Sequence, residues 1–347
     1  MRVGIIGGGF GLEVQAPIIR SYSKMNLVAV STMKRHKLPK DLMNGDSSPA
    51  HYTDWTQMLD QEKLDLVFVS TLPAHHYEMV KYALSRGIHV VCEKPFTMNS
   101  QESAELLNLA EEQQLKVLID FEWRYLPIRQ KAKKLTSQHA LGTLLHLEYH
   151  TSSAQFLKLQ SSAIGWMGDK KQFGGMLGAL GTHMIDCVRW LADDEVQWIQ
   201  GFVHTHVPEG AGELRDADDA FFIHGTMGRG PTFSIQLLSG INHGFGSHLK
   251  IFGSSGTIHI INDKTLYYGT AVEPLQEIDI PTLTTAPNTL SSEAQAYYPA
   301  FHTFINKVYD YIAFHKKDKD LPTIADAHEN QTIIDKILAN IVPPKKA

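Results

Sequence analysis

The start of the chain constrains its fold more than any other stretch. An apolar run leads into a glycine-rich turn at residues 7–11, and a helical pattern follows the turn. Gly7 and Gly9 fit the first two positions of the pattern G-x-G-x-x-G, whereas Leu12 occupies the third. Glycines let the backbone approach a pyrophosphate closely, and the helix start presents unpaired N–H groups to it. The stretch predicts a dinucleotide-binding turn in which Gly11, in place of a glycine at position 12, allows the close packing that the pattern requires. A glycine turn without a ligand is the alternative.

Apolar runs and helical patterns alternate after this turn. Buried strands are predicted at residues 27–31, 64–69, 87–91 and 116–120, with helices between them at 54–60, 74–86 and 99–114. Gly87 is a suitable C-terminal cap for the second of these helices, and Asn99 with Glu102 resembles a capping box before the third. Strands that alternate with helices predict an α/β fold with a doubly wound parallel sheet that ends near residue 121.

The end of the second predicted strand indicates which dinucleotide is bound. An NAD site usually has an acidic residue there, which accepts hydrogen bonds from the ribose 2′-hydroxyl, and this chain has none. Ser31 and Thr32 are expected to donate to a 2′-phosphate instead, with Lys34 or Arg35 as its counter-charge. The sequence therefore favours NADP over NAD, while a solvated basic loop is the alternative.

A lysine follows directly after the strand predicted at 87–91. The apolar run ends in Glu93, Lys94 and Pro95, which places Lys94 at the carboxyl end of a parallel strand. Ligands of open α/β sheets bind at this edge, and a lysine in low-dielectric surroundings loses its proton more easily than one in water. Lys94 is therefore a candidate catalytic residue, and a solvated loop lysine is the alternative.

The second half of the chain is rich in strands. They are predicted at residues 144–150, 196–206, 220–226, 232–238, 248–252, 257–261 and 275–280, and two helices are predicted at 292–315 and 324–340. Long runs of strands with hairpin-like spacing predict a second, α+β domain with a mostly antiparallel sheet.

A histidine and an acid form a second candidate constellation. Residues 184–191 have helical apolar spacing, so His183 and Asp186, three residues apart, share one helix face. A carboxylate beside an imidazole can hold its tautomer and raise its basicity. The pair is therefore a candidate for proton transfer, and a structural histidine in a glycine-rich helix is the alternative.

Composition excludes several classes of function. A formal net charge of −5 gives no basic footprint for nucleic acid, and no apolar run approaches the length of a membrane span. Cys92 and Cys187 are too few for a disulfide framework, and the chain enters its first strand without room for a signal peptide, so a cytoplasmic location is expected. No histidine pair has a convincing metal spacing; a site at His204 and His206, on one predicted strand face, is the less favoured alternative to no metal.

Several of these stretches resemble the signature series of one family. They are residues 4–11, 71–76, 92–95 and 174–186, and the stretch 321–327 before the last helix is similar too. Together they resemble the Gfo/Idh/MocA oxidoreductases, which include glucose–fructose oxidoreductase and inositol dehydrogenase. The resemblance covers essentially the whole chain, and Glu-Lys-Pro at this spacing is specific.

The resemblance implies a fold and an activity. It implies a Rossmann domain at residues 1–121 and a substrate-binding and oligomerisation domain at residues 122–347 with a large open sheet. It implies hydride transfer between NAD(P) and a hydroxyl or keto group of a sugar, cyclitol or related polyol. Homodimers or homotetramers formed through the C-terminal sheet are implied as well.

The resemblance also implies roles for single residues. Lys94 would bind the reacting oxygen and tune proton transfer, His183 would accept the proton when alcohol becomes ketone, and Asp186 would orient the substrate or His183. Expected substrate contacts are Lys94, Trp123, Arg124, Trp166 and His183. Expected cofactor contacts are Gly7, Gly9, Phe10, Gly11, Ser31, Thr32, Lys34, Arg35, Thr71, Leu72, His76, Glu93 and Lys94, with His76 near the nicotinamide.

One position departs from the family pattern. Many catalytic members carry Asp four residues before the histidine, where this chain has Ala179. Either Asp186 substitutes for that carboxylate or the usual proton route is weakened. A sensor that binds dinucleotide and sugar without turnover therefore stays open. An oxidoreductase of a non-sugar such as a dihydrodiol or a tetrapyrrole also stays open, because the pocket residues are too generic to exclude it.

Overall fold

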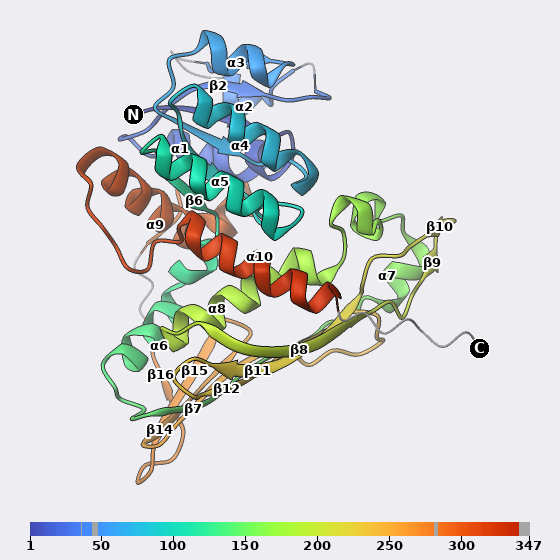
Figure 1. Ribbon diagram of the computed structural model, residues 1–347, viewed down its shortest axis with the longest axis vertical. Coiled ribbons are helices and arrows are strands. Elements are labelled where there is room, and N and C mark those ends of the chain that lie inside the picture. Colours follow the sequence, from blue (N-terminus) through green and yellow to red (C-terminus); the bar gives the residue numbers. More distant parts are fainter. Residues whose placement is uncertain (36, 44–47, 281–283, 340–347) are drawn as a thin grey trace. The chain divides into compact units, whose positions relative to one another are not determined.

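The computed structural model describes residues 1–35, 37–43, 48–280 and 284–339 (Figure 1). The chain forms two compact units, Met1–Tyr125 with Thr282–His328 and Leu126–Pro281 with Glu329–Ala347. The predicted division into residues 1–121 and 122–347 stays a prediction. The chain returns to the first unit because the long helix α9 (Ser292–Phe314) packs against α1 (Ala16–Ser21) and η3 (Glu122–Tyr125).

A six-stranded parallel sheet forms the centre of the first unit, as the alternation predicts. Its strand order is β3-β2-β1-β4-β5-β6, and each neighbouring pair runs parallel. The order reverses between β1 and β4, which is the place where open α/β sheets bind ligands. The strands are β1 (Arg2–Ile6), β2 (Asn26–Ser31), β3 (Ala50–Tyr52), β4 (Leu66–Val69), β5 (His89–Cys92) and β6 (Val117–Ile119). The sequence did not predict β3, because its three residues are partly exposed and contain no apolar run.

Helices and short turns connect these strands. Gly87 adopts a φ of +73° after α4, and the Asn99 side chain accepts the N–H of Glu102 at 2.9 Å, so both predicted caps are confirmed. The Glu102 carboxylate in turn accepts the N–H of Met98 at 3.0 Å. The further helical elements are η1 (Gly11–Gln15), α2 (Lys40–Met43), α3 (Trp55–Gln61), η2 (Pro73–His75), α4 (His76–Ser85) and α5 (Ser100–Glu112).

An eight-stranded sheet dominates the second unit. Its order is β16-β15-β14-β13-β7-β12-β11-β8, and all neighbours are antiparallel except β12 and β7. The prediction of a large, mostly antiparallel sheet is confirmed, although β15 was not predicted. The strands are β7 (Leu144–Ser152), β8 (Val196–His204), β11 (Ala220–Met227), β12 (Thr232–Leu238), β13 (Gly246–Gly253), β14 (Gly256–Ile261), β15 (Thr265–Thr270) and β16 (Gln276–Ile278), and a separate ribbon pairs β9 (Glu209–Gly210) with β10 (Glu213–Leu214).

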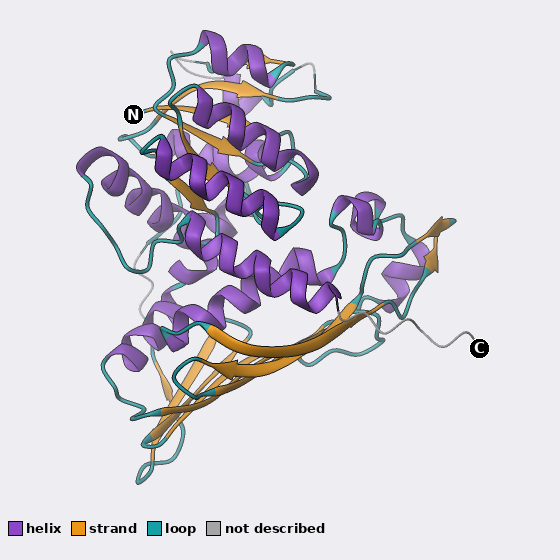
Figure 2. Ribbon diagram, viewed as in Figure 1, coloured by secondary structure: helices purple, strands orange, loops and turns teal. Residues whose placement is uncertain are grey.

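Helices cover one face of this sheet (Figure 2). α8 (Thr182–Ala192) packs on β7, β12 and α6 (Pro127–Ser137), and alternate strand residues such as Leu147 and Tyr149 are buried beneath the helices. The smaller helices are α7 (Phe156–Ser161), η4 (Gly165–Gly168), η5 (Lys170–Gln172) and η6 (Leu177–Gly181). α10 (Ile324–Ala339) matches the last predicted helix, whose residue 340 lies outside the described residues.

No helix in the described part of the chain is both long enough and apolar enough to cross a membrane.

Candidate active site

The glycine turn is tightly packed on one side and open on the other. Gly7 donates its N–H to the Ser31 carbonyl at 2.9 Å, and a Cβ on Gly7 would lie 2.2 Å from the carbonyl oxygen of Ser70. A Cβ on Gly11 would come within 2.8 Å of the Ser70 side chain, so Gly11 supplies the expected closeness. Gly9 is exposed, and a Cβ there would meet nothing within 4 Å. This cradle fits a pyrophosphate that approaches the backbone at Gly9.

The end of β2 carries an acidic neighbour that the sequence did not reveal. Ser31 and Thr32 are each only 1% exposed, and the Thr32 hydroxyl donates to the Arg35 carbonyl at 2.9 Å. Lys34 is exposed, whereas the Arg35 guanidinium forms an ion pair with Glu13 of η1 at 2.5 Å. Glu13 therefore partly offsets the positive charge that favours a 2′-phosphate.

His76 joins two loops at the edge of the parallel sheet. The imidazole is fully buried, with Nδ1 2.9 Å from the Pro95 carbonyl and Nε2 3.1 Å from the Thr71 carbonyl. Burial lowers the pKa of His76 to about 4, against the raising effect of these carbonyls. Its contacts hold the Thr71–Leu72 loop against the turn that contains the cis Lys94–Pro95 peptide.

Three other predicted residues of the first unit lie next to η1 or in η3. The Phe10 ring packs edge-on against Tyr297 of α9, with 5.0 Å between the ring centroids. Trp123 is half-buried in η3. The Arg124 guanidinium is 3% exposed and pairs with Asp326 at 2.8 Å, which fixes the start of α10 to η3.

The carboxyl ends of β4, β5 and β6 meet at one buried amide. Gln15 donates from Nε2 to Glu93 at 2.9 Å and to Asp120 at 2.8 Å, and it accepts a hydrogen bond from the Ser70 hydroxyl. The second Glu93 oxygen accepts the backbone N–H of Lys94 at 3.3 Å. Lys94 therefore lies beside Glu93 at the predicted sheet edge. Sequence reasoning missed Gln15 and Asp120.

The second unit places the histidine and the acid on one buried helix. His183 and Asp186 are 3% and 2% exposed, and both belong to α8. The helix start is fixed by Asn330, whose side-chain amide donates to the Thr182 carbonyl at 2.9 Å. The predicted helix is confirmed.

Ala179 and Trp166 precede this helix. Ala179 lies in η6, one turn before His183, and its methyl group cannot accept a hydrogen bond. Trp166 is half-buried in η4. The structure thus keeps the predicted His183 and Asp186 pair on one helix but offers no carboxylate at 179.

The family comparison follows this division of the chain. Residues 1–121 match the description "Oxidoreductase family, NAD-binding Rossmann fold", and residues 129–259 match "GFO/IDH/MocA C-terminal domain". The chain belongs to the Gfo/Idh/MocA oxidoreductases. The resemblance seen in the sequence is thereby confirmed, and within this family Lys94 falls in the Rossmann part while His183 falls in the C-terminal part.

Relatives of this Gfo/Idh/MocA protein are distant. An uncharacterized oxidoreductase of Synechocystis is 26% identical over 299 residues, which cover 81% of this chain and 79% of the relative. Levoglucosan dehydrogenase of Pseudarthrobacter phenanthrenivorans is 27% identical over 180 residues, 52% of this chain and 45% of the relative. A solved structure of levoglucosan dehydrogenase in complex with NADH and levoglucosan has a TM-score of 0.83 at 19% identity, covering 97% of this chain and 96% of the other.

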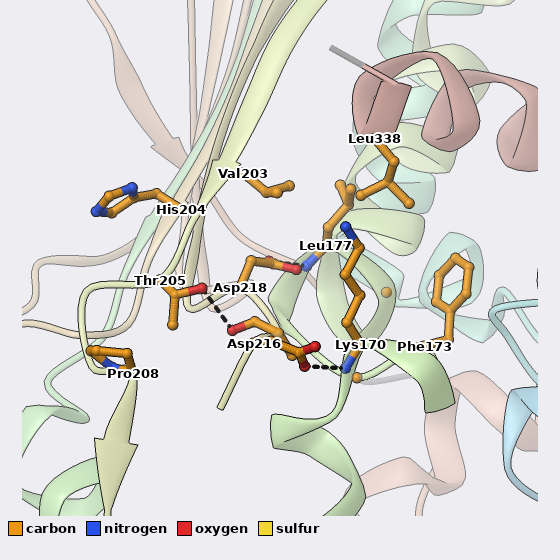
Figure 3. Close-up of a pocket in the computed structure, with 13 residues that line it drawn as sticks. Lys170, Phe173, Leu177, Val203, His204, Thr205, Pro208, Asp216, Asp218 and Leu338 are labelled. Carbon is orange, nitrogen blue, oxygen red and sulfur yellow. Dashed lines mark hydrogen bonds between the residues drawn. The ribbon is translucent and has the colours of Figure 1, made fainter. Parts of the chain in front are cut away.

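This Gfo/Idh/MocA chain also has a cavity of about 450 Å³ within its second unit (Figure 3). Its wall is mainly apolar and includes Phe173 and Leu177. The Asp218 carboxylate accepts the N–H of Leu177 at 2.8 Å, and burial raises the pKa of Asp218 to about 7. The N–H of Lys170 donates to Asp216 at 2.8 Å at the rim. None of the predicted catalytic, substrate-binding or cofactor-binding residues lines this cavity.

His204 and His206 were the less favoured candidates for metal ligands. Among the described residues, no group of three or more His, Cys, Asp and Glu side chains is placed to hold a metal ion. His204 and His206 lie with ring centroids 4.5 Å apart, and His206 Nδ1 is 2.8 Å from the Asp219 carboxylate.

Proposed function

We propose that this protein is an NAD(P)-dependent dehydrogenase or reductase that acts on a hydroxyl or keto group of a sugar, cyclitol or related polyol. The observation that carries the proposal is the Glu93–Lys94 pair at the carboxyl edge of the parallel sheet, in the same unit as an open glycine cradle. The family supports oxidoreductase chemistry, and the match to levoglucosan dehydrogenase supports a sugar-like substrate.

In this proposal two side chains handle the proton and the charge. The Lys94 ammonium donates a hydrogen bond to the reacting oxygen and stabilises the negative charge that develops on it. His183 accepts the hydroxyl proton on a ring nitrogen as the alcohol is oxidised, and Asp186 orients the imidazole. When bound, the nicotinamide supplies the acceptor or donor for the hydride. The backbone at Gly9 holds the pyrophosphate.

A panel assay tests this function. The purified protein is mixed with NADP or NAD and with levoglucosan, free sugars, inositols, sugar phosphates and non-sugar diols, and absorbance is followed at the reduced-nicotinamide band. Growth with a sugar or cyclitol supports the proposal, and growth only with a non-sugar diol contradicts the substrate class.

A sensor is the second candidate, and Ala179 favours it. A chain without a carboxylate four residues before the histidine can bind dinucleotide and sugar without turnover. Saturable NADH binding without reduction of NAD or NADP by any panel member supports the sensor and overturns the enzyme.

The cofactor preference rests on the charges at the end of β2. We propose that NADP is preferred and NAD accepted, because Lys34 and Arg35 offer positive charge to a 2′-phosphate. The Arg35–Glu13 ion pair opposes this preference.

Glu13→Gln is therefore expected to raise the affinity for NADPH relative to NADH by about 2- to 5-fold, since an exposed charge pair contributes up to about 1 kcal/mol. Fluorescence titration of both cofactors at one ionic strength measures the ratio. Glu111→Gln, which alters an exposed acid on α5, serves as the control. An unchanged ratio in the Glu13 variant contradicts a role of this pair in selectivity.

The outer face of the large sheet is proposed to join copies of this chain into a homodimer or homotetramer. Trp198 and Phe202 on β8 are 51% and 45% exposed there, and Phe202 stacks on Phe222 at 5.0 Å. Aromatic residues gathered on one face are typical of protein interfaces.

Sedimentation velocity at micromolar concentration is expected to show a dimer or tetramer that Phe202→Glu dissociates. Val272→Glu, at an exposed apolar residue outside the strands, should leave the assembly intact. A monomeric wild-type protein contradicts this assembly.

A further inference from the structure

Three strand ends of the parallel sheet converge on a single side chain. Gln15 is 1% exposed, and its amide carries two hydrogens, one directed at Glu93 (2.9 Å) and one at Asp120 (2.8 Å). Its oxygen accepts from the hydroxyl of Ser70. The amide thus ties the ends of β4, β5 and β6 together, and Glu93, one of its partners, precedes Lys94.

The surroundings of the two acids at this amide stabilise a negative charge to different degrees. Glu93 accepts the Gln15 amide and the Lys94 backbone N–H, and it is partly exposed. Asp120 is fully buried, no donor among the described residues reaches its Oδ1, and the Glu93 side chain lies in hydrogen-bonding range of the Asp120 carboxyl. A buried carboxylate without hydrogen bonds to one oxygen is costly, whereas the neutral acid is tolerated.

The surrounding charges act in the same direction. Burial, Glu93 and Glu122 raise the pKa of Asp120 well above its usual range. Burial also raises the pKa of Glu93, but the positive charge of Lys94 lowers it. Cys92, which precedes Glu93, has its pKa raised by burial, so it adds no charge at neutral pH. Tyr297 of α9 likewise has a raised pKa.

We propose that Gln15 and a neutral Asp120 are positioning residues that hold Glu93 as the charged partner of Lys94. The amide fixes the Glu93 carboxylate, and the proton on Asp120 prevents a second negative charge from acting on the lysine. This role of the pair rests on the proposed function of Lys94, whereas the charge arrangement itself does not.

The protonation of Asp120 is tested through stability. A carboxyl with a raised folded pKa binds its proton more tightly in the native state, so its stabilising effect is full below about pH 4 and is lost as pH rises toward the folded pKa. Asp120→Asn does not show this pH-dependent loss of stability, because an asparagine side chain does not titrate. Urea unfolding of the full chain from pH 5 to 8 should therefore show the folding equilibrium constant of the wild type falling at least about tenfold relative to the variant. Glu111→Gln is the matched control and should follow the wild type.

The positioning role is tested through the reactivity of Lys94. Labelling by acetic anhydride across pH, read by mass spectrometry of the peptide that contains Lys94, reports when this amine loses its proton. Asp120→Asn should leave the midpoint unchanged, because it removes no charge. Gln15→Glu places an additional acid at the amide and should move the midpoint to higher pH.

Opposite results overturn the inference. If Asp120→Asn follows the wild-type stability curve, or lowers the labelling midpoint, Asp120 carries a charge in the native protein. If Gln15→Glu leaves Lys94 labelling unchanged, Gln15 has a packing role only. If Asp120→Asn fails to fold, the Gln15→Glu labelling decides alone. Neither experiment needs a substrate, so an inactive substrate panel overturns the proposed function without deciding the charge arrangement.

Discussion

Lys94→Ala is expected to lower kcat by about 10²- to 10⁴-fold, while the dissociation constant of the reduced cofactor changes far less. Lys94 lies at the sheet edge, where its backbone N–H donates to Glu93, and the proposed function gives its side chain contact with the reacting oxygen. Removing the ammonium removes a charge that is needed in the transition state more than in the bound cofactor. Steady-state rates and a fluorescence titration of NADPH on the same preparation measure both quantities.

The control for this variant is Lys63→Ala, an exposed lysine of the same unit. Its kcat should equal that of the wild type. Equal losses of kcat and cofactor affinity in Lys94→Ala would show that the lysine serves binding alone, and they would contradict its assignment to the chemistry.

Gly9→Ala is expected to weaken NADPH and NADH binding at least about tenfold, or ~1.4 kcal/mol, with little change in the free energy of unfolding. The protein itself leaves room at this position, since a Cβ meets nothing within 4 Å. The added methyl would therefore hinder only the pyrophosphate that is proposed to lie against the backbone. Calorimetric or fluorescence titration and urea unfolding separate the two effects.

Gly7→Ala is the matched comparison. Its Cβ would lie 2.2 Å from the Ser70 carbonyl oxygen, so β1 and β4 must move apart. We expect a loss of roughly 1–3 kcal/mol in the free energy of unfolding, as for other overpacked sites. Wild-type cofactor affinity in Gly9→Ala would contradict the placement of the pyrophosphate at this turn.

Local patterns were sufficient to predict much of the fold. The apolar runs identified five of the six parallel strands, and Gly87 and Asn99 marked helix ends through contacts within a few residues. β3 escaped because a short, partly exposed edge strand needs little apolar sequence. The sequence did not predict that α9 packs in the first unit, because helix periodicity does not reveal which sheet a helix will cover.

The candidate site was predictable where chemistry and strand ends coincide in the sequence. Lys94 is proposed on this ground, whereas the helix that carries His183 was predicted from its apolar spacing. Gln15 was not, because its partners Glu93 and Asp120 lie 78 and 105 residues away, and only the sheet order brings them together. Glu13 was missed for a similar reason, since its partner Arg35 follows the next strand.

Hydride transfer is tested by following deuterium from the substrate to the nicotinamide. Levoglucosan, inositols and sugars deuterated at their carbinol carbons are incubated with the protein and NADP or NAD, and the reduced cofactor is examined by mass spectrometry. One deuterium is expected in each reduced nicotinamide for the substrate that turns over, and Lys94→Ala is expected to transfer far less. Reduced cofactor without deuterium, or bound cofactor that no member of the series reduces, would contradict hydride transfer by this protein.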